Sequence, residues 1–275
     1  MDYLIYFLKG LFIGGTMLIP GVSGGTMAMA LGLYGKLISS VANIKNKFKD
    51  GIAVLLPVAL GGLLGAILLS SPIETLKTSF MLPTMYFFVG SIAGSVPMIL
   101  KNAFSKSESK KFSIKDAVYI VIGIAVPVCI HILQSTFEKS SALSEQTGIV
   151  GILVGLVIGG ICAISLSLPG ISTSYMLLLL GVYDRVLNAF SKLDILYLLP
   201  MAVGALICLF LFSKFMEKQL KYHPRASYTL ILGFIIGSVL LVFPYTLPSG
   251  FEWIICPLLF ALSFIAMYML SRKQK

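Results

Sequence analysis

Ten apolar segments take up most of this 275-residue chain and constrain its fold more than any other feature. Most approach the roughly 20 residues that a helix needs to cross about 30 Å of hydrocarbon. Charged residues are 12% of the chain, about half their share in soluble domains. No alternating pattern indicates barrel strands, so we predict an all-α polytopic membrane protein. The segments lie at about 3–19, 22–35, 52–70, 84–100, 117–133, 148–168, 171–183, 195–212, 228–247 and 252–270.

The two halves of the chain repeat one pattern. Residues 20–23 read Pro-Gly-Val-Ser and residues 169–172 read Pro-Gly-Ile-Ser, and the similarity continues at an offset of 149. It resumes at an offset of 143 between residues 55–96 and 198–239, so the second copy has lost six residues from one loop. A duplicated unit that interrupts its membrane helices at equivalent points is typical of transporters with a central substrate site.

Lysine and arginine are concentrated in alternate loops. Sixteen of the 21 follow the second, fourth, eighth and tenth apolar segments, whereas four follow the third, fifth, seventh and ninth. The positive-inside rule therefore places both termini and the four basic segments in the cytoplasm. The start, Met1-Asp2-Tyr3, lacks the basic n-region of a cleaved signal peptide, so the first segment is expected to remain in the mature protein.

This topology makes the two Pro-Gly motifs the tips of hairpins that enter from opposite faces. We predict one membrane domain, 1–275, built from inverted repeats at about 1–133 and 148–271, each a hairpin plus about three transmembrane helices. The helix after each tip, 22–33 or 171–182, has about twelve residues and would be about 18 Å long, too short to span. We expect re-entrant hairpins, although two full crossings would give the same sidedness.

The tips have the composition of an anion site. Pro20 and Pro169 end the descending helices, and Gly21 and Gly170 permit the reversal. A helix N-terminus then presents unpaired N–H groups and partial positive charge. The alternative is that the serines only cap helices and the glycines only allow close packing. The predicted phosphate-binding residues of the tips are Ser23, Gly24, Gly25, Thr26, Ser172, Thr173 and Ser174.

Three basic residues are further candidates for phosphate contact. Lys9 lies within the first apolar segment, and an intramembrane charge usually has a function. Lys36 and Arg185 stand at matched positions after the two tips, where they receive an anion or simply extend to the interface. No metal or cofactor is predicted, because the four cysteines and two histidines form no cluster with metal-ligand spacing.

These motifs resemble the polyprenyl-phosphate transporter family of the PopT type, long known only as a bacterial domain of unknown function. The resemblance rests on Lys9-Gly10, the run 20–26, the segment 31–34, the run 168–172 and the segment 181–183. It implies a plasma-membrane translocase that returns undecaprenyl phosphate to the cytoplasmic leaflet for reuse in peptidoglycan and other envelope polymers. The implied partner is this lipid, with no nucleic acid. Thr173 departs from the glycine that the family has in its second motif.

The main alternative is an enzyme. Membrane undecaprenyl-pyrophosphate phosphatases of the BacA type resemble this layout but use an arginine after the motif serine, together with glutamates. Gly24 and Thr173 stand at those arginine positions here, and neither 3–19 nor 148–168 contains an acidic residue. Without an acid–base pair, hydrolysis is not expected. A transporter for a small soluble anion remains a third possibility.

The topology can be tested by cysteine labelling in a cysteine-free background. We expect 36–50, 101–116 and 213–226 on the cytoplasmic side and 184–194 outside. A cysteine at position 188 should therefore react with an impermeant reagent in intact cells, and one at position 45 should not. Labelling of both from outside would contradict the inverted hairpins.

Overall fold

The structure is a computed structural model. It describes residues 2–17, 23–105, 107, 109, 111–136, 148–192, 194–243 and 245–273. These residues form twelve α-helices and no strand, which confirms the all-helical prediction for this part of the chain. The helices are α1 (Asp2–Thr16), α2 (Gly24–Ala30), α3 (Tyr34–Ala42), α4 (Phe48–Ser79), α5 (Met81–Ala103), α6 (Ile114–Thr136), α7 (Gly148–Ser167), α8 (Thr173–Leu179), α9 (Tyr183–Ser191), α10 (Ile195–Tyr222), α11 (Pro224–Val242) and α12 (Glu252–Lys273).

Seven helices in the described ranges are long and apolar enough to cross a membrane, so the chain is a multi-pass membrane protein. Six of them form two consecutive sets of three, α4 to α6 and α10 to α12, and the seventh is α7. Helix α1 has 15 residues, fewer than the roughly 17 that a span requires.

The segments that return from the tips are shorter than predicted. Instead of about twelve residues, α2 and α8 have seven each. Gly32 and Gly181 end them with φ angles of 65° and 68°. In both, the N–H of the residue after the glycine donates to a carbonyl five positions back, at 2.8 Å for Leu33 and 3.0 Å for Val182. This Schellman termination satisfies the last carbonyls, and a separate short helix, α3 or α9, follows.

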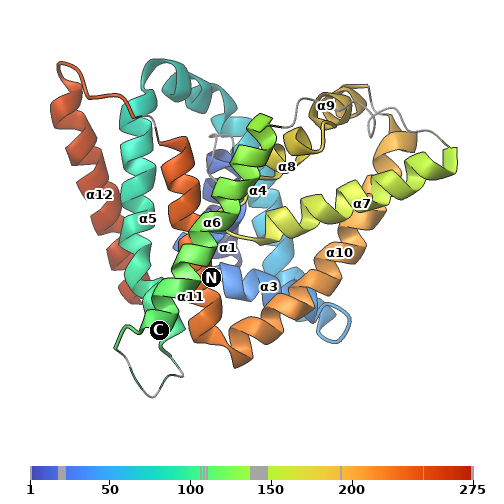
Figure 1. The fold of residues 1–275 in the computed structure, drawn as a ribbon, viewed down its shortest axis with the longest axis horizontal. Helices are drawn as coiled ribbons and strands as arrows, with labels where there is room; N and C mark the ends of the chain where they lie inside the picture. Colours follow the sequence, from blue (N-terminus) through green and yellow to red (C-terminus); the bar gives the residue numbers. More distant parts are fainter. Residues whose placement is uncertain are drawn as a thin grey trace.

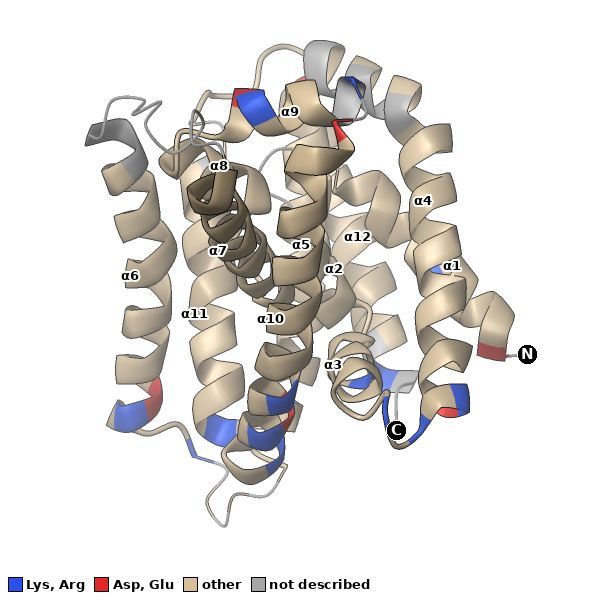
Figure 2. Ribbon diagram, turned by 90° about the vertical axis from the view of Figure 1, so that its right-hand side faces the viewer, with Lys and Arg blue, Asp and Glu red and all other residues tan. Residues whose placement is uncertain are grey.

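The basic loops gather at one end of the molecule. Figure 2 shows lysine and arginine where α6 and α11 begin and where α10 ends, the region that we name the basic end. Helix α3 lies towards this end and α9 lies at the opposite one (Figure 1). The residues that define the basic end are Lys115, Lys214, Lys218, Lys221 and Arg225.

Four helix pairs carry the fold, and glycines bring their backbones together. Helix α1 packs on α4, α7 on α10, α5 on α12 and α6 on α11. A Cβ atom at Gly61 would lie 2.1 Å from the carbonyl oxygen of Phe7, and one at Gly204 would lie 2.0 Å from that of Leu156. Small residues let membrane helices approach this closely, which increases their van der Waals contact. The α5–α12 and α6–α11 pairs meet in the same way at Gly90, Gly94, Gly123 and Gly233.

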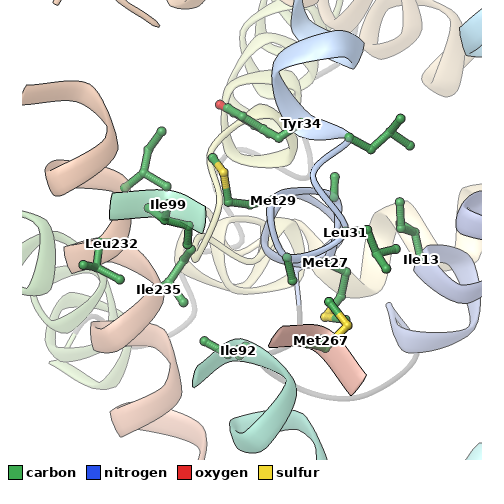
Figure 3. Close-up of a cluster of buried hydrophobic side chains, with 14 of the residues drawn as sticks. Ile13, Met27, Met29, Leu31, Tyr34, Ile92, Ile99, Leu232, Ile235 and Met267 are labelled. Carbon is green, nitrogen blue, oxygen red and sulfur yellow. The ribbon is translucent and has the colours of Figure 1, made fainter. Parts of the chain in front are cut away.

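Helix α2 lies at the centre of the main hydrophobic core. All seven of its residues are buried. Figure 3 shows Met27 and Met29 of α2 among side chains from α1, α5, α11 and α12, including Ile92 and Ile235. The residues directly after the first tip are therefore held in the interior, although their helix is too short to be stable alone.

Two adjacent glycines in α4 test the packing against α1. Gly61→Ala should lower the free energy of unfolding by about 1–3 kcal/mol, the usual cost of overpacking, because its Cβ would collide with the Phe7 carbonyl. Gly62→Ala is the matched control, since its nearest neighbour, the Gly10 carbonyl oxygen, would lie 3.6 Å away. Thermal unfolding in detergent measures both variants. Equal stability of the two would contradict this packing.

Candidate functional site

The first tip is described from Ser23 onwards; Pro20 and Gly21 lie outside the described residues. Ser23 is the N-cap of α2, and its Oγ accepts a hydrogen bond from the Thr26 N–H at 3.1 Å. The hydroxyls of Ser23 and Thr26 also bond to each other at 2.8 Å. Both side chains are buried. The capping expected of a serine at this position is therefore present.

The second tip meets the first tip directly. Gly170 has a φ angle of 85°, a conformation that favours glycine. Its backbone N–H donates to Thr26 Oγ1 at 2.8 Å and to Ser23 Oγ at 3.1 Å. The two motifs thus share one buried hydrogen-bonded cluster, which we name the tip contact: Ser23, Thr26 and Gly170.

Gly25 allows this approach. A Cβ atom at Gly25 would lie 3.1 Å from the Pro169 nitrogen and 3.3 Å from the Leu168 carbonyl carbon. Both distances are tighter than ordinary van der Waals contact. Gly24 is also enclosed, since its Cβ would lie 2.8 Å from the Met17 sulfur. Close packing therefore explains why Gly24 and Gly25 of the first tip are small.

The hydroxyl residues of the second tip are less enclosed than those of the first. Ser172 is the N-cap of α8 but makes no side-chain capping bond, and it lines a cavity of only about 20 Å³ with Tyr175. The Thr173 hydroxyl lies 3.2 Å from Ser165 Oγ of α7. Ser174 is exposed. The structure does not bring these three residues into the tip contact.

A larger cavity of about 190 Å³ adjoins the first tip. Gly24 and Gly25 form part of its wall, and the rest comes from α1, α2, α3, α4, α7 and α10. Ser213 of α10 also lies in this wall, fully buried, and its hydroxyl has no hydrogen-bond partner among the residues that the structure describes. We name this cavity of about 190 Å³ the head cavity. Sequence reasoning missed Ser213, although a serine within a long apolar helix is itself a signal.

Ser213 differs from the other buried serines within described helices. Each of the others donates to a carbonyl of its own helix at 2.7–3.0 Å. A buried hydroxyl without a partner has a free-energy cost. Ser213 is therefore a polar side chain in the wall of the head cavity for which the described residues supply no hydrogen-bond partner. The serines with partners are Ser91, Ser95, Ser165, Ser167, Ser238 and Ser263.

Lys9 and Lys36 lie away from the tip contact. Lys9 Nζ donates to the carbonyl of Leu31 at 2.8 Å, at the C-terminal end of α2. A cation is favourable there because it complements the partial negative charge of a helix C-terminus. Lys36 Nζ donates to the Tyr6 hydroxyl and lies over the Tyr6 ring, 4.9 Å from its centroid. Both lysines therefore have a protein partner in this conformation.

Arg185 lies near the end opposite the basic end, on α9. Its guanidinium pairs with Asp194 at 2.8 Å and stacks over the Tyr197 ring, 4.4 Å from the centroid. Asp194 also caps α10 by accepting from the Tyr197 N–H. These contacts fasten α9 to α10. Lys9, Lys36 and Arg185 thus do not converge on one centre.

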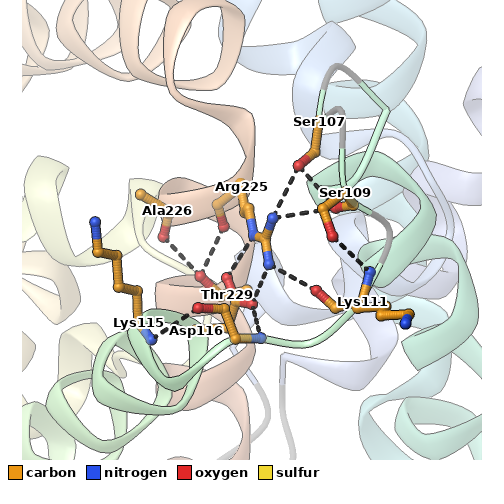
Figure 4. Close-up of polar contacts among 9 residues, drawn as sticks. Ser107, Ser109, Lys111, Lys115, Asp116, Arg225, Ala226 and Thr229 are labelled. Carbon is orange, nitrogen blue, oxygen red and sulfur yellow. Dashed lines mark hydrogen bonds and ion pairs between the residues drawn. The ribbon is translucent and has the colours of Figure 1, made fainter.

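An ion pair at the basic end was not singled out from the sequence. Arg225 donates to both carboxylate oxygens of Asp116, at 2.6 and 2.7 Å, and the Asp116 side chain is only 1% exposed (Figure 4). The remaining guanidinium bonds go to Ser107 Oγ and to the carbonyls of Ser109 and Lys111. This bidentate pair ties the loop before α6 to the start of α11. The sequence signal for this ion pair is an acidic residue, Asp116, in the first turn of α6 and a basic residue, Arg225, in the first turn of α11.

The described residues contain no group of three histidine, cysteine or acidic side chains placed to hold a metal ion. The chemistry that the tips offer consists of backbone N–H groups and hydroxyls in an apolar interior. Such donors suit the oxygen atoms of an anion.

Comparisons with known proteins identify the family of this chain. A family described as undecaprenyl phosphate translocase-like matches residues 13–251, which include both tips. A polyprenyl-phosphate transporter of Staphylococcus aureus is 34% identical over 277 aligned residues, which cover 98% of this chain and 96% of the relative. One of Vibrio cholerae is 29% identical over 259 residues, 89% of this chain and 79% of the relative. No solved structure matches. The chain belongs to the undecaprenyl phosphate translocase-like family.

Proposed function

We propose that this protein moves undecaprenyl phosphate from the outer to the inner leaflet of the bacterial plasma membrane, so that the carrier lipid is reused in cell-envelope synthesis. Similarity to two polyprenyl-phosphate transporters supports the substrate class. The undecaprenyl chain is soluble in hydrocarbon, whereas an unpaired phosphate ion there costs on the order of tens of kcal/mol in the idealised limit. The protein needs to supply a polar site only for the headgroup.

The tip contact is the observation that carries this proposal. It places a backbone N–H and two hydroxyls in an otherwise apolar interior. In this conformation the Gly170 N–H donates to both hydroxyl oxygens, and one of the two hydroxyls donates to the other. When the tips separate, phosphate oxygens would accept the Gly170 N–H and the hydroxyls of Ser23 and Thr26. The ligand would then replace a protein–protein contact of similar polarity, so the exchange would leave no donor buried without a partner.

Two cavities support alternating access around the tips. The head cavity beside Gly24 and Gly25 is about 190 Å³ and includes residues of α3, which lies towards the basic end. The cavity beside Ser172 is about 20 Å³ and lies between the later turns of α6 and α11, away from that end. We infer that this conformation is open on the side of the basic end, the cytoplasmic side by the positive-inside rule.

Related helix pairs support an exchange between two such states. The α1–α4 and α7–α10 pairs are equivalent in the two sequence halves, and so are α5–α12 and α6–α11. We propose that the halves are inverted repeats with re-entrant hairpins, and that movement of the two hairpins relative to each other opens the tips alternately to each face. Lys9 and Lys36 would attract the phosphate from the basic side and Arg185 from the other side.

A phosphatase is the less favoured alternative. The residues that line the two tip cavities include no histidine and no acidic side chain. Hydrolysis of a pyrophosphate needs a group that activates water and another that protonates or neutralises the leaving group. The tips supply donors for binding, and no base is among the described residues that line these cavities.

Transport without bond cleavage can be tested with purified protein. We expect it to bind undecaprenyl phosphate and to release no inorganic phosphate from undecaprenyl pyrophosphate, because the tips lack a general base. Phosphate release is measured colorimetrically, with and without added divalent metal. Release that copurifies with the protein over several columns and is absent from a Ser23→Asp preparation would favour the phosphatase.

Charge at the tips tests the predicted phosphate site. An aspartate at position 23 still accepts from the Thr26 and Gly170 N–H groups, so Ser23→Asp should fold. Its negative charge would repel phosphate in a poorly screened interior. We expect Ser23→Asp, alone and with Ser172→Asp, to weaken undecaprenyl phosphate binding at least about tenfold, or about 1.4 kcal/mol.

Ser105→Asp is the control for these variants, since it adds the same charge at an exposed position. Lipid binding is measured in nanodiscs, together with surface exposure of the carrier lipid in cells. Wild-type binding by the Ser23→Asp, Ser172→Asp double variant would show that the tips are structural turns only.

A further inference from the structure

Another cavity, with an apolar wall, lies beside the end of α1. Its volume is about 320 Å³, and it lies between the α1–α4 pair and the α5–α12 pair. We name it the apolar cavity. Its lining residues come from all four helices; those used below are Phe12, Thr16, Leu69, Thr84, Phe87 and Leu259.

The wall of this cavity offers almost no hydrogen-bonding group. Thr16 and Thr84 are the polar residues among those that line it, and both hydroxyls are already used. Thr16 Oγ1 donates to the Ile13 carbonyl at 2.8 Å, and Thr84 Oγ1 donates to the Phe80 carbonyl at 2.7 Å. A phosphate would find no partner here, whereas a hydrocarbon chain loses nothing on entering. The wall chemistry therefore selects an apolar ligand.

The apolar cavity is next to the head cavity. Thr16, the last residue of α1, lines the apolar cavity, and Met17, the next residue, lines the head cavity. One turn earlier, Phe12 lines the apolar cavity and Ile13 lines the head cavity. The two cavities thus flank the same turn of chain, one with an apolar wall and one beside the tip contact. This is the arrangement that an amphiphile with one charged head and one long tail requires.

The apolar cavity also lies in the half of the membrane from which the substrate would come. Thr84 is in the first turn of α5, and Leu76 is near the end of α4. The α4–α5 junction is at the end of the molecule opposite the basic end (Figure 2). By the positive-inside rule this is the outer half of the membrane. A tail seated there would bring its headgroup to the tips from the outer leaflet.

We propose that the apolar cavity binds the isoprene units of the polyprenyl chain nearest the phosphate. This inference rests on the proposed function, since it assigns the tail of the same substrate. A volume near 320 Å³ is at the lower limit of about 300 Å³ for small-ligand sites. It accommodates only the first part of an undecaprenyl chain, so the rest stays among the membrane lipids.

The test fills the cavity from α12 and compares two adjacent positions. Leu259 lines the apolar cavity, and Leu258, its neighbour, is 53% exposed and does not. Leu259→Trp should weaken binding of undecaprenyl phosphate and of undecaprenol at least about tenfold in phospholipid nanodiscs. Leu258→Trp should change neither. Thr84→Leu adds a smaller side chain to the cavity from another helix, α5, and should also weaken binding of both lipids. It replaces Leu259→Trp in the test if Leu259→Trp folds poorly.

Undecaprenol, which has the tail without the phosphate, separates this inference from the proposed function. If the wild type binds both lipids equally while Leu259→Trp weakens both, the tail site stands and the phosphate site fails. If folded Leu259→Trp and Thr84→Leu bind undecaprenyl phosphate as tightly as Leu258→Trp does, the tail site is wrong. The preference of the wild type for undecaprenyl phosphate over undecaprenol would still test the proposed function.

Discussion

The backbone N–H of Gly170 needs a partner in the interior of a membrane protein, and much of the structure depends on how it finds one. A helical hairpin that turns within the protein exposes backbone donors where solvent is scarce, and each unsatisfied donor costs several kcal/mol in hydrocarbon. The first tip supplies the acceptors, the hydroxyls of Ser23 and Thr26. Each tip is therefore complete only in the presence of the other.

Close helix packing keeps the two tips in register. Four helix pairs meet through glycines, and the α1–α4 and α7–α10 pairs contain the helices that precede the two tips, α1 and α7. Gly170 is also fixed from the other side, since a Cβ atom there would lie 2.3 Å from the Phe234 carbonyl oxygen of α11. The scaffold helices thus set the distance between the tips. A substitution in the pairs would act on the tip contact without touching it.

The charged side chains lie around this centre and not in it. Lys9 binds the C-terminal end of α2, Lys36 lies beside Tyr6, and Arg185 joins α9 to α10. Hydroxyls and N–H groups bind an anion more weakly than buried cations do. We infer that weak neutral donors at the centre suit a carrier, which must release its ligand on the far side, better than a permanent ion pair would.

The sequence alone determined the class and the elements, because these depend on local hydropathy and turn chemistry. Apolar length predicted the membrane helices, the offset of 149 identified both tips, and loop charge predicted the basic end that the structure shows. Even the early end of α2 and α8 had its signal in Gly32 and Gly181.

Only the tertiary structure decided what each polar residue contacts. Pairing depends on distances between segments far apart in the chain, so a sequence could name Ser23 and Gly170 but not join them. It could not show that Lys9 has a carbonyl partner, or that the Ser213 hydroxyl has none. The two cavities that flank the end of α1 arise from the packing of several helices, and packing has no signature in any one segment.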